Sequence, residues 1–371
     1  MEFFQRLQSG LQLNSSEKLN AIPSKLKSFC KKAALHKFFK ERVAFNDRRY
    51  AHFDVMAKVA TLEVEGTGTG LRYQDVKIVF ERNSGFSEQS QVAKRIKSSL
   101  DILATSVPSG TKIFRNRSIT QSFITMICHL QKSMDLKGKE KIIGAFAKQF
   151  VEALAGEVEK GQDATDTDLI AFQKSVNANV KTGPIVRQQV LLRKLFQFAP
   201  DIIDGVDATA VAAANFEGEI AAVAKLVRSD ILAINEAHSG TKGEDLFKAT
   251  NKTASAQASI GEPATSFESY KSLIENMYFL FWEGSGSKLA DRPESFKDVN
   301  ALRTELQHDT DHGDKKSVAK KKMKNASVFQ KYAGATSPAL AAPSRFAVLQ
   351  LNLLKVIRGD LQALLAAAGK P

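Results

Sequence analysis

The stretch FKDVNALRTELQHDTDHGD, residues 296–314, places an arginine and a histidine five positions apart at the end of an apolar helical pattern. The pair is Arg303 and His308, and a second histidine, His312, follows beside two aspartates. An arginine stays charged and can hold a phosphate with two donors, whereas a histidine exchanges a proton near neutral pH. The stretch therefore combines a fixed cation with a titrating base near the end of an expected helix.

This pair meets the minimal chemical need for metal-independent RNA cleavage, in which the ribose 2′-hydroxyl attacks its own phosphate. His308 would move a proton, and Arg303 would stabilise the developing charge. In a regular helix, however, positions five apart point about 140° away from each other. A shared site therefore requires that the helix unwinds before His308, that the long arginine reaches round, or that two chains combine their copies.

Two other interpretations of the same residues stay open. Arg303 can pair with an acid such as Glu305 or Asp309 on a structural face, while His308 is solvated at a helix C-terminus. Alternatively, His308, Asp309 and His312 can hold a metal ion, but the sequence has no second ligand cluster to complete such a site. We therefore predict no metal and no cofactor.

The rest of the chain predicts an all-α fold. Its 371 residues suffice for two domains with separate cores. Apolar residues recur at helical spacing and strand signals are scarce, the best being Val76 to Phe80. The composition becomes alanine-rich after Pro200, so we predict a helical domain over residues 1–204 and a helical bundle over residues 205–371.

An aromatic stripe precedes the Arg303 segment and predicts a strong helix that packs into the core of the bundle. A long connection over residues 239–266, with at most a short helix in it, is expected before that helix. The stripe consists of Phe267, Tyr270, Leu273, Ile274, Met277, Tyr278, Phe281 and Trp282.

The charge favours a polyanionic partner, because 53 lysines and arginines against 40 acids give a net charge of +13. Lys112, Arg115 and Arg117 precede an expected helix, whose positive end would also attract an anion. Lys315 and Lys316 begin a lysine run that continues to residue 324. We predict that these five residues contact nucleic acid, with an ordinary exposed basic turn as the alternative at residues 112–117.

Another basic stretch, residues 29–42, interleaves lysines with aromatic residues. It fits either a phosphate-facing surface or an amphipathic helix with solvated lysines. The second interpretation is favoured, because Phe29, Leu35, Phe38 and Phe39 suffice for a buried stripe.

The two cysteines, Cys30 and Cys128, lie in separate segments without a ligand cluster, as expected for reduced, buried thiols. The N-terminal residues lack a basic start followed by an apolar run, and no apolar stretch approaches the roughly 20 residues that span a bilayer. We therefore expect a cytoplasmic protein without a membrane partner.

The segment ALRTELQHD, residues 301–309, resembles the Rx4H motif of HEPN proteins, compact helical domains that often act as ribonucleases in toxins and antiviral systems. The resemblance implies that Arg303 and His308 are catalytic in a HEPN-like bundle, with Asp309 and His312 as auxiliary residues. It also implies a homodimer, because the family's site forms where two bundles pair. Thr304 follows the arginine, whereas active members often have Asn, Asp or His there.

The N-terminal half carries a second resemblance. FFQRLQSGLQLNSSEKLNA, residues 3–21, and FRNRSITQSF, residues 114–123, resemble the helical region downstream of the ParB-like nuclease domain in GmrSD-type restriction proteins. The resemblance implies a ParB-like nuclease partner. Together the two resemblances imply a component of bacterial anti-phage defence that acts as an endoribonuclease, or alternatively a non-catalytic basic scaffold for nucleic acid or the nuclease.

Overall fold

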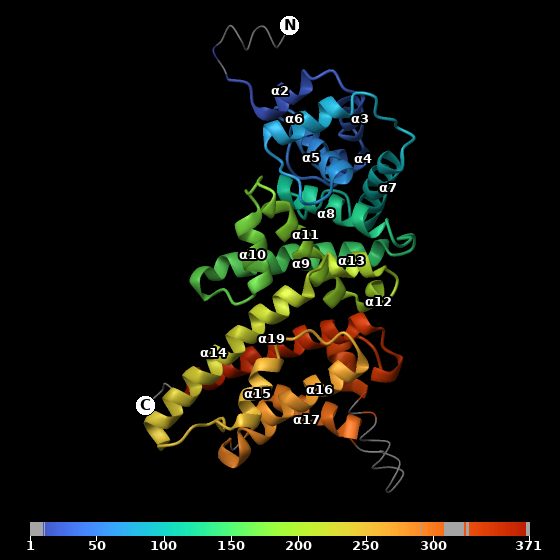
Figure 1. Cartoon of the computed structure of the whole chain (residues 1–371). Coiled ribbons are helices and arrows are strands. Elements are labelled where there is room, and N and C mark those ends of the chain that lie inside the picture. Colours follow the sequence, from blue (N-terminus) through green and yellow to red (C-terminus); the bar gives the residue numbers. More distant parts are fainter. Residues whose placement is uncertain (1–9, 11, 290, 308–322, 324–325, 369–371) are drawn as a thin grey trace. The chain divides into compact units, whose positions relative to one another are not determined.

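The computed structural model describes residues 10, 12–289, 291–307, 323 and 326–368. These residues form helices joined by turns (Figure 1), and the described part contains one isolated β-bridge but no strand. The prediction of an all-α fold is therefore confirmed. Val76 to Phe80, the best strand signal, lies instead in a helix, α6 (Tyr73–Arg82), because Val76, Val79 and Phe80 recur at helical spacing and are all buried.

The chain divides into two compact units, and between residues 199 and 214 it passes from the first unit to the second, back to the first and again to the second. The first unit comprises Met1–Phe198 and Gly205–Ala214, and the second comprises Ala199–Asp204 and Asn215–Pro371. The expected boundary between residues 204 and 205 falls inside residues 199–214. Each unit has its own aromatic core.

The first unit has the following helices in chain order: α2 (Ser15–Asn20), α3 (Lys25–Ala33), α4 (Lys37–Glu41), α5 (Ala51–Glu65), α6, α7 (Gln91–Ser106), α8 (Arg117–Leu130), α9 (Glu140–Lys160), η1 (Gly161–Asp163), α10 (Thr167–Ser175), α11 (Thr182–Phe198) and α13 (Ala208–Ala212). Helices α5 and α8 pack against each other and are buried on most sides. They form the centre of the unit, as expected for helices that are apolar all round.

The start of the first unit shows what the LNSSE sequence does locally. The side chain of Asn14 accepts the backbone N–H of Glu17 at 2.8 Å, and Glu17 accepts the backbone N–H of Asn14 at 2.9 Å. This reciprocal capping box fixes the first turn of α2. Arg49 then donates to the Glu17 carboxylate at 2.9 Å, so the motif joins α2 to the loop before α5.

Two buried arginines join the later helices of this unit. Arg193 of α11 contacts Asp168 of α10 at 2.6 Å and donates to the backbone carbonyl of Ala214 at 2.6 Å. Arg187 is 1% exposed and donates to neutral oxygens, including the carbonyl of Ala178 at 3.2 Å. Burial lowers the pKa of Arg187 to about 10. Both arginines thus tie α11 to the chain segments around it.

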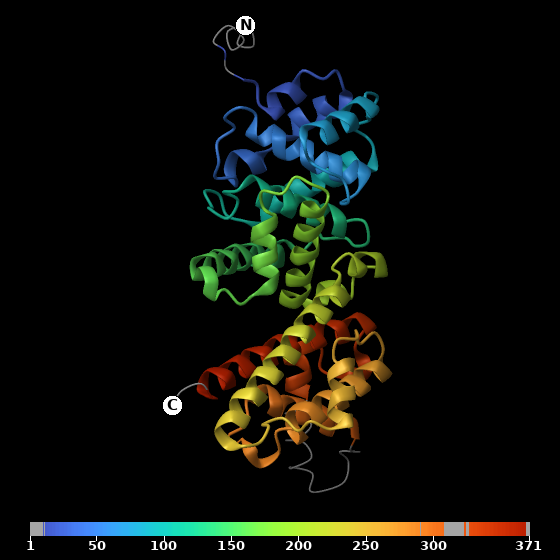
Figure 2. The same ribbon diagram turned by 60° about the vertical axis from the view of Figure 1, so that its left-hand side comes forward.

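The second unit contains α12 (Pro200–Ile203), α14 (Phe216–Lys242), α15 (Asn251–Ser259), α16 (Phe267–Met277), the π-helical turn η2 (Tyr278–Glu283), η3 (Gly286–Lys288), α17 (Glu294–Gln307), η4 (Pro338–Leu340) and α19 (Pro343–Ala368). Residues 326–333 are also helical. The long helices α14 and α19 lie side by side (Figures 1 and 2). They run in the same direction, because Lys355 pairs with Glu219 and Arg358 pairs with Asp230 further along.

The aromatic stripe expected over residues 267–282 contributes Tyr270, Leu273, Ile274, Met277 and Phe281 to this unit's core, whereas Phe267 is 37% exposed. Tyr270 stacks on Phe346 with ring centroids 4.9 Å apart, and Phe281 packs on Phe296 at 5.2 Å. The regular α-helix ends at Met277, however, and the stripe continues as a π-helical turn. The sequence predicts a connection with at most a short helix over residues 239–266. In the structure, the residues of this stretch up to Lys242 belong to α14.

Candidate functional site

Arg303 lies in the last two turns of α17 and packs on an aromatic ring. The carbon of its guanidinium group is 4.3 Å from the ring centre of Tyr278, the first residue of the π-helical turn. Its Nε atom is buried and has no hydrogen-bond partner among the residues that the structure describes. Arg303 is therefore half-buried and held on the face of an aromatic residue.

Glu305 does not neutralise Arg303. One carboxylate oxygen of Glu305 is buried without a hydrogen-bond partner, and within the described ranges no carboxylate forms an ion pair with Arg303. Burial raises the pKa of Glu305 above its ordinary value. The structural ion pair between these two residues, which the sequence left open, is thus not formed.

Most of the remaining predicted site lies outside the described residues. This holds for His308, Asp309, His312, Lys315 and Lys316. Helix α17 continues to Gln307, the residue before His308, so the backbone stays helical up to that point. Of the two predicted catalytic residues, the structure therefore places Arg303 alone.

In addition to Arg303, two further cations pack on aromatic rings of the π-helical turn. Arg292 lies 4.1 Å from the ring centre of Trp282, and Lys252 lies 3.2 Å from that of Phe279. A π-helical turn is rare and changes the direction in which successive side chains point. Tyr278 and Trp282, expected in the core stripe, are half-buried and carry cations instead. Sequence periodicity missed these contacts because it assumes a regular helix.

In the first unit, two basic stretches that lie about 70 residues apart in the sequence are adjacent. Val43 and Phe114 form a parallel β-bridge, and the backbone N–H of Ala44 donates to the carbonyl of Phe114 at 3.0 Å. The ring of Phe114 packs on that of Phe38 at 5.2 Å. Residues 37–44 and 112–117 are thus joined through both backbone and core.

Except for Arg42, which is half-buried and pairs with Glu41 at 3.0 Å, the basic side chains of these two segments are exposed. Phe38, Phe39 and Phe114 are at most 1% exposed, whereas the cations between them are exposed. Within the described part of the chain none of these cations forms an ion pair. We call this group the basic surface; it consists of Lys37, Lys40, Lys112, Arg115 and Arg117.

The start of α8 does not offer the free backbone amides that the sequence suggested for an anion. The side chain of Asn116 accepts the backbone N–H groups of Ser118 at 2.8 Å and Ile119 at 3.2 Å. These amides are therefore already capped. Any anion held near Arg115 or Arg117 would have to be bound mainly by their side chains.

The interpretation of residues 29–42 as an amphipathic segment is correct for three aromatic residues and wrong for the leucine. Phe29, Phe38 and Phe39 are buried, but Leu35 is 64% exposed, because the chain turns between α3 and α4. Cys30 and Cys128 are buried free thiols, as predicted, and burial raises the pKa of both.

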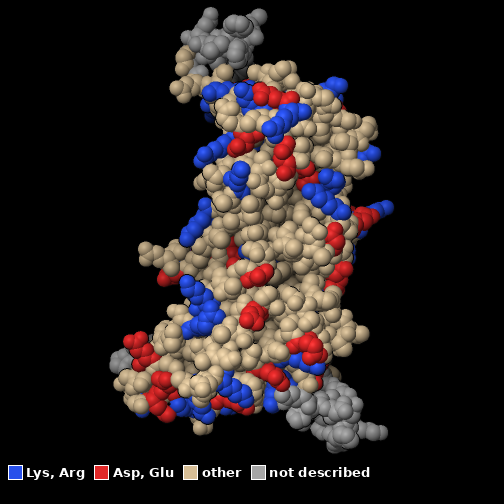
Figure 3. Space-filling view, in the orientation of Figure 1, with Lys and Arg blue, Asp and Glu red and all other residues tan. Residues whose placement is uncertain are grey.

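The excess positive charge belongs to the N-terminal part of the chain. Residues 1–200 contain 32 lysines and arginines and 19 acids, whereas residues 201–371 contain 21 of each. On the face shown in Figure 3, basic and acidic side chains are interspersed. The basic surface is therefore defined by its residues rather than by one field that covers a whole face.

Comparisons with known proteins add no relative. No family model, curated protein or solved structure matches the chain significantly. Among the described helices, none is long and apolar enough to cross a bilayer. The functional interpretation therefore depends on the chemistry of the two sites described above.

Proposed function

We propose that the chain is a non-catalytic helical scaffold that binds nucleic acid through the basic surface of its first unit. One observation carries this proposal. Two basic segments, distant in sequence, share an aromatic core and expose five cations that no acid pairs with among the described residues. Cations without a carboxylate partner are the groups that bind phosphates most readily.

The size of the basic surface sets the strength of the expected effect. Five phosphate contacts on duplex DNA would give a slope of about −4.5 in a plot of log K against log salt. The contacts would be insensitive to sequence, because phosphates are the same at every base pair. We therefore expect weak sequence preference and a steep loss of affinity with salt.

The first test is a salt titration of the intact chain with a fluorescent 20-base-pair duplex, followed by anisotropy. A slope near −4 to −5 supports binding by about this number of cations. A slope near zero, or no binding at low salt, overturns the proposal. A ParB-like nuclease, which the resemblance of residues 3–21 and 114–123 implies, would act on the nucleic acid held in this way.

The second candidate function is metal-independent RNA cleavage by Arg303 and His308 in a homodimer, as part of an anti-phage defence system. It is favoured by the lack of a carboxylate partner for Arg303 among the residues that the structure describes, because an unneutralised guanidinium can stabilise a phosphorane charge. It ranks second because Arg303 already packs on Tyr278 and because α17 stays helical up to Gln307. The C-terminal half also carries no net positive charge.

RNA cleavage is tested with His308→Ala and Arg303→Ala proteins on a structured RNA in the presence of EDTA. Loss of cleavage in both variants supports catalysis, provided that each keeps the thermal unfolding midpoint of the parent. His238→Ala is the matched control, because this histidine lies in the same unit and is not part of the motif. Equal activity in all proteins, or activity in none, refutes the catalytic proposal.

A further inference from the structure

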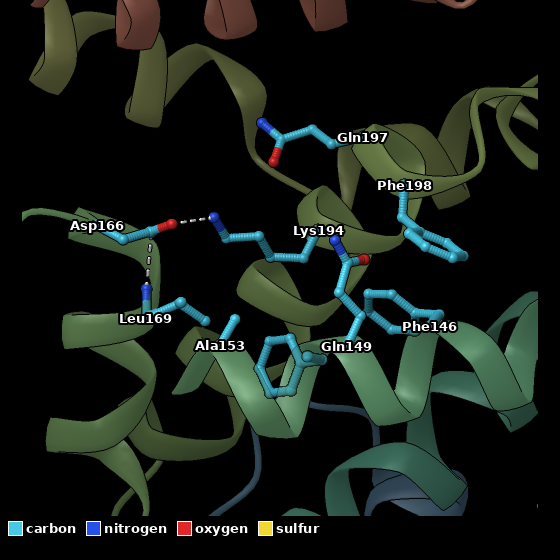
Figure 4. Close-up of a pocket in the computed structure, with 9 residues that line it drawn as sticks. Phe146, Gln149, Ala153, Asp166, Leu169, Lys194, Gln197 and Phe198 are labelled. Carbon is cyan, nitrogen blue, oxygen red and sulfur yellow. Dashed lines mark hydrogen bonds and ion pairs between the residues drawn. The ribbon is translucent and has the colours of Figure 1, made fainter. Parts of the chain in front are cut away.

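A pocket of about 280 Å³ lies between α9, the start of α10 and the end of α11 (Figure 4). All of its lining residues belong to the first unit. Its volume is just below the roughly 300–1,000 Å³ of most small-molecule sites. The pocket therefore fits a single ring system better than a dinucleotide or another large cofactor.

One end of the pocket is aromatic. The rings of Phe146 and Phe198 have centroids 5.8 Å apart, and Phe150 lies 5.8 Å from Phe146. Phe146 and Phe150 are almost completely buried, whereas Phe198 is 38% exposed. Phe198 thus presents an aromatic surface on which a planar ligand can stack.

The other end of the pocket carries an ion pair that is fixed in place. The ammonium group of Lys194 lies 2.5 Å from a carboxylate oxygen of Asp166, opposite the rings of Phe146 and Phe198 in Figure 4. Asp166 also caps α10 by accepting the backbone N–H of Leu169 at 3.1 Å. The two charges cancel, so this end offers a hydrogen-bond donor and an acceptor without net charge.

Amide groups complete the polar lining. The Nε2 atom of Gln197 is buried and has no hydrogen-bond partner in the part of the chain that the structure describes. Gln149, which is exposed on α9, also lines the pocket. A buried donor without an acceptor is costly, at about 1–3 kcal/mol, and a ligand acceptor at this position would remove that cost.

We propose that this pocket binds a nucleobase. A nucleobase is planar and uncharged, can stack on Phe198, and has donors and acceptors along one edge for Lys194, Asp166 and the glutamine amides. A charged ring would leave one member of the ion pair facing a like charge. A hydrocarbon ring would leave the amide of Gln197 without a partner.

The base can come from two sources, a free nucleoside or an unpaired base in a strand. The second source deepens the proposed function, since a strand bound at the basic surface would place a base in the pocket of the same unit. The first source does not depend on the basic surface. The experiment below separates them.

The test uses the full chain and two kinds of probe. Adenosine, guanosine, cytidine and uridine are titrated by isothermal calorimetry, and 12-nucleotide single strands with or without abasic sites are titrated by fluorescence anisotropy. Phe198→Leu keeps apolar volume but removes the stacking surface, and we expect it to weaken base-dependent binding about 10-fold. Gln197→Ala tests the amide by itself.

The matched control is Phe267→Leu, because Phe267 is 37% exposed, almost the same as Phe198, and lies in the second unit. If nucleosides bind more weakly to Phe198→Leu than to the parent, and normal strands bind no more tightly than abasic strands, the ligand is a free nucleoside. Stronger binding of normal strands, lost in Phe198→Leu, identifies a base in a strand. No nucleoside binding together with equal binding of normal and abasic strands overturns the proposal.

These outcomes differ from those expected if the basic surface does not bind nucleic acid. Replacing Lys112, Arg115 and Arg117 by glutamine would weaken normal and abasic strands equally and would leave nucleoside binding unchanged. If strands do not bind at all but nucleosides do, the proposed function fails and the pocket proposal stands.

Discussion

The contact between Arg303 and Tyr278 gives a measurable coupling energy. The guanidinium carbon lies 4.3 Å from the ring centre, and both side chains are half-buried. Cation–π pairs contribute about 0.5–1 kcal/mol at exposed sites and about 2 kcal/mol when desolvated. For this half-buried pair we predict a coupling of about 1 kcal/mol between Arg303→Met and Tyr278→Leu.

The assay is a double-mutant cycle of urea unfolding, followed by the fluorescence of Trp282. This residue is the chain's one tryptophan and belongs to the second unit, so the signal reports the unit that contains the pair. The cycle compares the parent, the two single variants and the double variant, which separates the pairwise energy from the loss of packing. A shared denaturant dependence is required for the comparison.

A matched control is available in the same unit. Lys271 lies 4.8 Å from the ring centre of Phe267, and the ring of Phe267 is exposed whereas that of Tyr278 is half-buried. The coupling energy between Lys271 and Phe267 should be smaller, at about 0.5 kcal/mol. If Arg303 and Tyr278 prove additive within about 0.3 kcal/mol, the contact does not hold Arg303, and the argument for a structural arginine is refuted.

Three further predictions concern stability. A Cβ at Gly144 would overlap the backbone of α7, so Gly144→Ala should lower the free energy of urea unfolding by about 1–3 kcal/mol. Gly156 has open space in the same helix, so Gly156→Ala should raise it by about 0.5–1 kcal/mol. Equal effects would contradict the packing of α9 on α7. Asp168→Asn leaves the guanidinium of Arg193 buried without its carboxylate and should cost about 3–5 kcal/mol by far-UV circular dichroism, and a cost below about 1 kcal/mol would refute a buried pair. Burial raises the folded-state pKa of Glu305, so the native state binds more protons than the unfolded state above pH 4.5 and loses stability as pH rises through the folded pKa. Glu305→Gln should therefore increase the free energy of unfolding at pH 7 but not at pH 4. An increase at pH 4 but not at pH 7 would be inconsistent with burial of the carboxylate.

The sequence predicts the helical fold well because helical spacing is a local property. Phe29, Phe38 and Phe39 repeat closely enough to identify a buried stripe, and the pattern also correctly places Tyr270, Leu273, Ile274, Met277 and Phe281 in the core of the second unit. Leu35 fails because a turn between two short helices breaks the periodicity on which the prediction depends. Local patterns therefore predict helices more reliably than they predict which side chains are buried near helix ends.

The sites depend on contacts that no local pattern contains. The bridge between Val43 and Phe114 joins segments about 70 residues apart, and neither stretch by itself shows that they share one surface. The pocket likewise needs Phe146 of α9, Asp166 at the N-cap of α10 and Phe198 of α11. Similarly, the sequence identifies Arg303 by its spacing from His308, but its packing on Tyr278 follows from a π-helical turn.

The most direct test of the central claim is the salt dependence of duplex binding by Lys112→Gln/Arg115→Gln/Arg117→Gln. The control is Lys225→Gln/Lys242→Gln/Lys248→Gln, which removes the same charge from exposed positions in the second unit. If the basic surface binds phosphates, the slope of log K against log salt should fall by about 3 in the first variant and stay unchanged in the control. Equal slopes in the two variants would contradict the proposal that nucleic acid binds at this surface.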